Sequence, residues 1–198
     1  MDSSIKTIVP KIHLANRPKF LQWLGKTLQK ISGWKVEGEI PNLKKFILVG
    51  APHTSNWDFV HALILIWAID LKLNVLAKHT LFKIPFLKNI LSGIGGIAVD
   101  RDNPQLVVDK VSKLTEGDGG VIIGLTPEGT RKRVEKWKSG FLRIADQTES
   151  KIVLIGINFE TKTCSFSGFF EPTGDNDRDI EFIKNFYKKF KPKIPSNF

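Results

Sequence analysis

Short apolar runs alternate along this chain with longer stretches of helical character, and this alternation limits the folds it can adopt. The clearest runs, residues 46–49 and 121–125, hold almost nothing but apolar side chains. Strands of this kind are typical of sheets that helices cover on both faces. Because runs and helices follow one another in turn, the pattern predicts an α/β fold with a mostly parallel central sheet flanked by helices.

The remaining boundaries follow from periodicity and from Gly and Pro positions. The predicted strands are 35–40, 46–49, 74–77, 97–99, 121–125, 152–158 and 164–169, the last as an edge strand. The predicted helices are 18–34, 56–71, 87–91, 104–114, 141–147 and 179–190. A length of 198 residues suits a single domain. We expect residues 1–34 to form an amphipathic N-terminal segment and 35–198 to form the functional domain.

The chain is strongly basic, with 30 Lys and Arg against 20 Asp and Glu and a net charge of +10. Such a surplus favours an anionic partner, which could be nucleic acid, a membrane surface or an acidic carrier protein. The single cysteine, Cys164, excludes a disulfide scaffold and a Cys-rich zinc site. We found neither a signal peptide nor an apolar run long enough to span a bilayer, so we expect a cytoplasmic protein.

The helix predicted over 18–34 has the pattern of an interfacial helix. Its apolar stripe consists of Phe20, Leu21, Leu24, Leu28 and Ile31. Lys19, Lys26 and Lys30 lie outside that stripe, and Trp23 and Trp34 are candidate anchors. Such a helix can lie on the inner face of an anionic membrane with its cations near lipid phosphates. The alternative is an ordinary surface helix that packs on its own domain.

A first polar loop, residues 51–58, follows a predicted strand and holds His53 and Asp58. A carboxylate five residues after a histidine can fold back and hold one imidazole nitrogen, which fixes the tautomer for general-base work. Ser55 is badly placed for the other nitrogen, so a substrate hydroxyl is the better nucleophile. The alternative is a simple helix cap with His53 in a polar loop.

Two further loops follow strands and carry groups that bind phosphate. Arg101 can hold a phosphate with two hydrogen bonds, or can form a surface ion pair with a neighbouring Asp. In the loop after 121–125, Gly129 allows a ligand to approach the backbone, and Thr130 and Arg131 can donate to phosphate. Glu128 can accept from a ligand hydroxyl or hold Arg131.

Together these loops resemble the glycerolipid acyltransferase family. The matching blocks are His53-x4-Asp58, Gly96-Ile97-x3-Arg101, Pro127-Glu128-Gly129-Thr130-Arg131 and Lys138-Ser139-Gly140-Phe141. The resemblance implies acyl transfer from acyl-CoA or acyl carrier protein to the hydroxyl of a lysophospholipid such as a 1-acylglycerol 3-phosphate. It implies His53 as general base, Asp58 as its orienting partner, and an acceptor site made by Arg101, Glu128, Gly129, Thr130, Arg131 and Lys138. It implies no metal and no other cofactor.

Two other functions remain open on the sequence alone. His53 could instead activate water, which would make the chain an acyl-thioester hydrolase. A non-catalytic module that binds anionic membranes or nucleic acid is the other alternative, and nucleic acid is not expected because the motifs do not require it.

Overall fold

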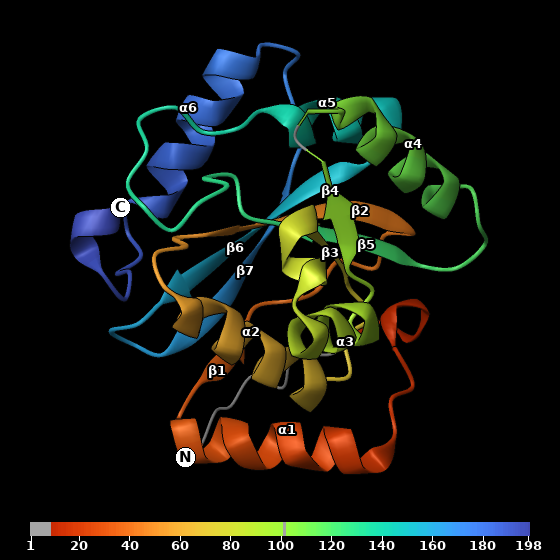
Figure 1. The fold of residues 1–198 in the computed structure, drawn as a ribbon. Coiled ribbons are helices and arrows are strands. Elements are labelled where there is room, and N and C mark those ends of the chain that lie inside the picture. Colours follow the sequence, from red (N-terminus) through yellow and green to blue (C-terminus); the bar gives the residue numbers. More distant parts are fainter. Residues whose placement is uncertain (1–8, 101) are drawn as a thin grey trace.

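The computed structural model describes residues 9–100 and 102–198, and it contains the predicted α/β fold (Figure 1). Seven strands form one sheet in the order β1-β7-β6-β2-β5-β3-β4. All neighbouring pairs are parallel except β6 and β7, which are antiparallel. The strands are β1 (Lys35–Glu37), β2 (Lys45–Ala51), β3 (Asn74–Lys78), β4 (Ile97–Val99), β5 (Val121–Leu125), β6 (Lys151–Asn158) and β7 (Thr163–Phe170).

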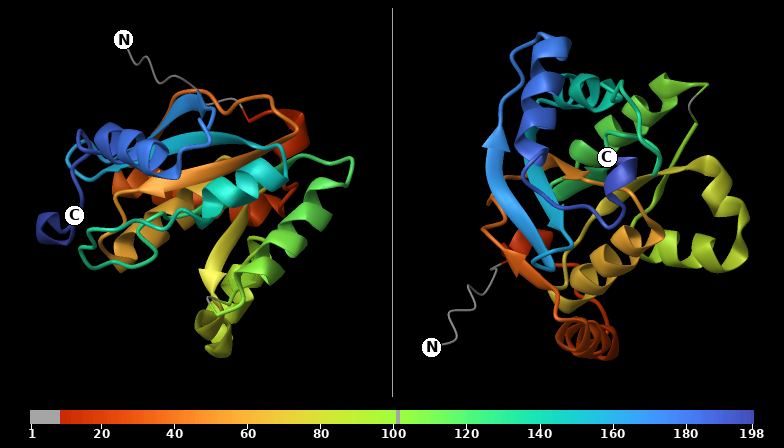
Figure 2. Two further views of the ribbon diagram at one scale, coloured as in Figure 1. Left: turned by 90° about the horizontal axis from the view of Figure 1, so that it is seen from above. Right: turned by 90° about the vertical axis from the view of Figure 1, so that its left-hand side faces the viewer.

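Helices cover both faces of the sheet, as the apolar runs predict (Figures 1 and 2). The α-helices are α1 (Lys19–Ser32), α2 (Asn56–Ala68), α3 (Pro85–Gly93), α4 (Pro104–Thr115), α5 (Gly140–Gln147) and α6 (Asn176–Tyr187). One core cluster joins alternate residues of β2, such as Ile47 and Val49, to α4, α5 and α6. The other joins Phe46 and Leu48 to α2 on the opposite face. Successive side chains of β2 therefore enter different cores, as the strand period of two requires.

Helix α1 lies outside α2 and packs against it through a small residue. A Cβ atom on Gly25 would lie 2.5 Å from the backbone nitrogen of Ala68, so only glycine permits this approach. The chain before α1 is fixed by Asp70, whose carboxylate accepts from the backbone N–H groups of Asn16 and Arg17 and lies 3.4 Å from the Arg17 guanidinium. Helix α1 is thus held at a defined position on the domain.

The predicted apolar stripe of α1 divides between protein and solvent. Of the stripe, Phe20 and Ile31 are exposed, whereas Leu21, Leu24 and Leu28 are half-buried. The anchor candidate Trp23 is exposed as well. The prediction that Trp34 is a membrane anchor is wrong: Trp34 is buried and stacks on His61 with ring centroids 4.4 Å apart. Periodicity could not show this, because Trp34 follows the end of the helix at Gly33, which has a φ of 74°.

Two strand predictions also need correction. The segment predicted as the edge strand 164–169 is β7, which lies between β1 and β6, and the edge position belongs to β1. Strand β1 ends at Glu37 and not at residue 40, because Gly38 turns the chain with a φ of 81°. A Cβ atom there would lie 2.4 Å from the carbonyl oxygen of Phe166, so the turn requires glycine.

Candidate active site

The loop after β2 carries His53, and its conformation is set by the start of α2. Ser55 is the N-cap of α2, and its Oγ accepts from the backbone N–H of Trp57 over 2.9 Å. The hydroxyl of Ser55 is therefore engaged in capping, as is typical for serine at this position. This agrees with a site in which Ser55 is not the nucleophile.

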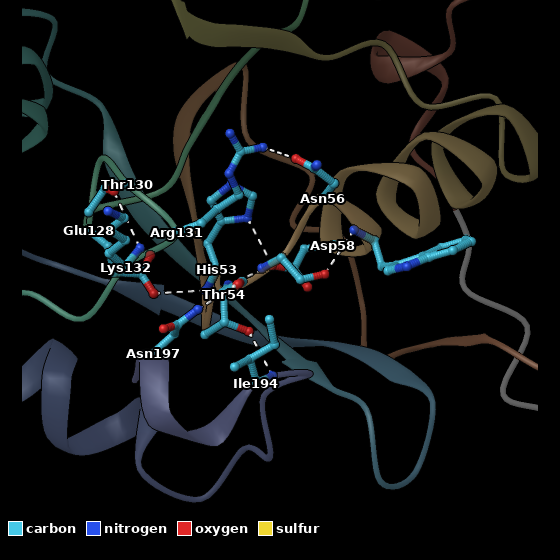
Figure 3. A network of polar contacts seen from close by, with 12 residues as sticks. His53, Thr54, Asn56, Asp58, Glu128, Thr130, Arg131, Lys132, Ile194 and Asn197 are labelled. Carbon is cyan, nitrogen blue, oxygen red and sulfur yellow. Dashed lines mark hydrogen bonds and ion pairs between the residues drawn. The ribbon is translucent and has the colours of Figure 1, made fainter.

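Asp58 binds three groups of this loop through one carboxylate oxygen (Figure 3). Its Oδ2 accepts from the backbone N–H groups of Thr54 and Ser55 over 2.6 and 2.7 Å, and it lies 3.1 Å from Nδ1 of His53. Asp58 is buried, and its Oδ1 has no hydrogen-bond partner among the residues that the structure describes. The same carboxylate thus completes the capping box of α2 and orients the imidazole, so the two alternatives in the sequence describe one structure.

The imidazole of His53 is fixed on one side and available on the other. With Nδ1 directed at Asp58, the second ring nitrogen is the free one, and within residues 9–100 and 102–198 it has no hydrogen-bond partner. The side chain remains 19% exposed. Such a group can take a proton from a molecule that approaches from solvent.

Glu128, in the loop after β5, contacts the His53 loop and not Arg131. Its Oε1 accepts from the backbone N–H of His53 over 2.8 Å. Burial raises the pKa of Glu128 to about 7, and the hydrogen bond from His53 opposes this rise. Its Oε2 is buried and has no hydrogen-bond partner within the described part of the chain. Glu128 therefore holds the backbone of the His53 loop, and its contact with the acceptor stays a prediction.

Among the other predicted acceptor groups, Arg131 lies beside the His53 loop. The Arg131 guanidinium donates to the side-chain oxygen of Asn56, which brings it beside the start of α2 (Figure 3). Gly129 has a φ of 64°, a left-handed conformation that suits glycine, and Thr130 Oγ1 accepts from the backbone N–H of Lys132 over 3.3 Å.

The loop after β5 is closed by Lys138, whose backbone N–H donates to the carbonyl of Pro127 over 2.8 Å. The Lys138 side chain is exposed. Arg101 lies outside the described residues.

The sequence did not indicate that residues near position 195 take part in this site. Thr54 Oγ1 accepts from the backbone N–H of Ile194, and the Thr54 carbonyl accepts from the side-chain amide of Asn197, both over 3.2 Å (Figure 3). These contacts join residues 140 and 143 positions apart. No local pattern marks Asn197, because its role depends on where the chain passes after α6.

The C-terminal segment, residues 191–198, is itself held against the rest of the domain. The backbone N–H of Phe159 donates to the carbonyl of Lys191 over 2.8 Å, and the Phe198 ring lies 6.1 Å from that of Trp137. Trp137 is buried and directly precedes Lys138. The segment 191–198 thus contacts both the His53 loop and the chain that closes the Glu128 loop.

Comparison with known proteins places these features in one family. Residues 34–158 match the family model described as Acyltransferase. A 1-acyl-sn-glycerol-3-phosphate acyltransferase of Borreliella burgdorferi is 30% identical over 139 residues, which are 65% of this chain and 53% of that protein. This chain therefore spans about half the length of that relative.

A solved structure has the same fold. The 1-acyl-sn-glycerophosphate (LPA) acyltransferase PlsC from Thermotoga maritima superposes with a TM-score of 0.62, over 86% of this chain and 76% of that one, at 21% identity. The matched span of the family model includes His53, Asp58 and Glu128, the three side chains that the fold brings together at the ends of β2 and β5. On this match, the chain belongs to the Acyltransferase family.

Proposed function

We propose that the chain transfers a fatty acyl group from a thioester to the hydroxyl of a lysophospholipid of the 1-acylglycerol 3-phosphate type, with His53 as general base. The observation that carries this proposal is the contact of 3.1 Å between His53 Nδ1 and Asp58 Oδ2. It leaves the other imidazole nitrogen to act on the acceptor. Family membership and the substrate in the name of the Borreliella burgdorferi relative support the choice of acceptor.

In the proposed reaction His53 carries one proton from the acceptor to the leaving group, and no side chain of the protein acts as nucleophile. The free nitrogen of His53 takes the proton of the acceptor hydroxyl while the hydroxyl oxygen attacks the thioester carbonyl carbon. The C–S bond of the tetrahedral intermediate then breaks, and the leaving thiolate takes the proton back from the imidazolium. The products are the acylated lipid and a free thiol. Asp58 stays in place throughout and holds the imidazole in one tautomer.

Cationic and backbone groups near His53 support binding of the acceptor phosphate. Arg131 lies beside Asn56 at the start of α2, and Thr130 lies in the same loop as Glu128. Gly129, Lys138 and Arg101 complete the proposed phosphate site. Glu128 is proposed to position the His53 loop, because its carboxylate binds the His53 backbone from a buried site.

The exposed side chains of α1 support a peripheral place on the cytoplasmic face of an anionic membrane. Phe20, Trp23 and Ile31 are exposed, and Lys19, Lys26 and Lys30 are exposed beside them. Such a helix lies in the interface with its apolar side chains below the phosphates. Among the described residues, no helix is both long and apolar enough to cross a bilayer.

Thiol release from long-chain acyl-CoA and from acyl carrier protein tests the proposal. Each donor is assayed with and without lysophosphatidic acid, and the lipid product is identified by mass. Release that requires the acceptor supports acyl transfer, whereas equal release without it would identify a thioester hydrolase. His53→Ala should lower kcat about a thousandfold. His79→Ala is the matched control, because His79 makes a weaker contact, 3.3 Å to the carbonyl of Val99, and has no place in the proposed chemistry.

A further inference from the structure

The connection from β3 to β4 is basic and free of acidic residues, a pattern that it shares with residues 3–36. Residues 71–99 contain no Asp or Glu, although the whole sequence has 20. The same segment contains four lysines, Lys72, Lys78, Lys83 and Lys88. The segment therefore supplies positive charge without any local carboxylate to neutralise it, and an anionic surface is the partner that it attracts.

At the centre of this basic segment two large apolar side chains face solvent. Ile84 is 51% exposed and Phe86 is 76% exposed, and Pro85 between them is exposed too. Lys83 and Lys88, on either side, are also exposed. Helix α3 needs none of these for its own packing, since its buried residue is Leu91, near its other end. We call residues 83–88 the α3 tip.

The topology places the α3 tip at the same edge of the sheet as the catalytic residues. Strand β3 is parallel to β5, and β5 is parallel to β2. The chain leaves the carboxyl end of β3 at Lys78 and reaches the tip through a short helix, His79–Lys83. His53 and Glu128 follow the carboxyl ends of β2 and β5 in the same way. The connection also stands out from the body of the molecule (Figure 2).

We infer that the α3 tip inserts into an anionic bilayer, with Ile84 and Phe86 below the lipid phosphates and with Lys83 and Lys88 among them. Aromatic and aliphatic side chains flanked by lysines have this preference at a membrane interface. This membrane contact of the α3 tip is separate from that of α1. It turns the edge of the sheet that carries His53 toward the lipid. It extends the proposed function, because the acceptor would then enter the site directly from the membrane.

An acidic carrier protein is the competing partner for the same lysines. Docking of such a protein depends mainly on the ammonium groups, whereas insertion into a bilayer depends on the two apolar side chains as well. The exposure of Phe86 favours the bilayer. The two partners can be separated by substituting the apolar and the cationic residues independently.

A fluorescent probe at position 86 tests the insertion without reference to catalysis. The chain has a single cysteine, Cys164, which is buried, so Phe86→Cys can be labelled selectively with an environment-sensitive dye. Phe182→Cys is the matched control, because Phe182 is a 52% exposed aromatic on α6. Vesicles that mix phosphatidylglycerol with phosphatidylcholine should shift the emission at position 86 to the blue, and nitroxide lipids should quench it. Position 182 should show neither effect.

Three results would overturn the inference. The first is an emission at position 86 that vesicles leave unchanged, and the second is an equal change of emission at position 182. The third is a blue shift at position 86 that appears without lipid, either on addition of acyl carrier protein or at higher protein concentration. A variant without the label gives the complementary result. Phe86→Ser should weaken binding to the anionic vesicles about tenfold, a loss that Lys83→Gln alone should not match.

Activity assays separate this inference from the proposed function. Phe86→Ser should lose activity about tenfold on acceptor held in vesicles, in proportion to its lost binding. It should keep wild-type activity on a short-chain acceptor below its critical micelle concentration. If the wild type transfers no acyl group to either acceptor, the proposed function fails while the probe still reports on insertion. If Phe86→Ser is wild-type on vesicles, the tip inference fails and the proposed function stands.

Discussion

The Glu128 carboxylate accepts a hydrogen bond of 2.8 Å from the backbone N–H of His53, a residue 75 positions earlier in the chain. This bond joins the loop after β2 to the loop after β5. Glu128 is 5% exposed, so its carboxylate has little contact with solvent. It therefore influences His53 through the backbone, and its own protonation is tied to the stability of the fold.

The raised pKa of Glu128 predicts how stability depends on pH. Burial raises the pKa from 4.5 to about 7, so between these values the folded chain binds a proton that the unfolded chain has lost. Glu128 therefore makes the fold less stable as pH rises from about 4.5 to about 7, by at most about 3 kcal/mol, with no further change above that range.

Glu128→Gln should remove this pH dependence and keep an oxygen that accepts from His53. Urea unfolding at about pH 5 and about pH 8 should show that wild type loses more stability between the two conditions than the variant does. The exposed residue Glu135 supplies the control substitution Glu135→Gln, which should behave as wild type. An equal pH response in wild type and Glu128→Gln would contradict the assignment.

Asp58→Asn should impair turnover more than substrate binding. One carboxylate oxygen binds two backbone N–H groups and the His53 ring, and a neutral amide gives weaker hydrogen bonds to all of them. We expect kcat to fall about a hundredfold with little change in KM, and the free energy of unfolding to fall by about 2 kcal/mol. Steady-state kinetics and urea unfolding measure both. A rise in KM at constant kcat would show that Asp58 binds substrate.

The contacts of Thr54 with residues 194 and 197 predict that a distant segment positions His53. Thr54→Val removes the oxygen that accepts from Ile194, and Asn197→Ala removes the donor to the Thr54 carbonyl. Each should lower kcat about fivefold to tenfold with KM unchanged, since each removes one hydrogen bond from the loop.

Two further variants make this test specific. Thr54→Ser keeps a hydroxyl and should restore most of the activity. Ser196→Ala changes an exposed neighbour of Asn197 and should have no effect. If Thr54→Ser is as slow as Thr54→Val, the lost methyl group and not the hydrogen bond is responsible.

Arg131→Ala should weaken binding of a phosphorylated acceptor. The guanidinium lies beside Asn56 at the start of α2, where it can meet a phosphate next to His53. We expect KM for lysophosphatidic acid to rise about tenfold, and KM for a monoacylglycerol without phosphate to stay unchanged. Arg133→Ala, at an exposed position two residues away, is the control. Equal losses on both acceptors would remove Arg131 from the phosphate site.

Local patterns in the sequence predicted the elements and the central pair of the site well. Alternating apolar runs indicated the parallel sheet, and the spacing of His53 and Asp58 reflects a turn at the start of α2, so both could be found within a few residues. The place of β7 inside the sheet could not be found in this way, because strand order depends on pairing with β1, which lies more than a hundred residues earlier. Periodicity likewise showed that α1 is amphipathic without showing that Trp34 packs on His61.

The role of Glu128 shows the same limit within the site. Its motif made it a candidate site residue, but a carboxylate in a Gly-containing loop can face a ligand, a neighbouring arginine or the backbone of another loop. The choice is made by the separation of β2 and β5, which are adjacent strands in the sheet. Only the three-dimensional arrangement shows that its partner is the N–H of His53.

The long span between Thr54 and Asn197 has a consequence for synthesis of the protein. The residues that bind the Thr54 hydroxyl and carbonyl lie 140 and 143 positions after Thr54, so they emerge from the ribosome long after the His53 loop. Contacts of such separation form late, because the intervening chain must be ordered first. A nascent chain that already holds every residue of the family match still lacks the hydrogen bonds that finish the His53 loop. The loop that carries His53 is therefore completed only after residue 197 has emerged from the ribosome.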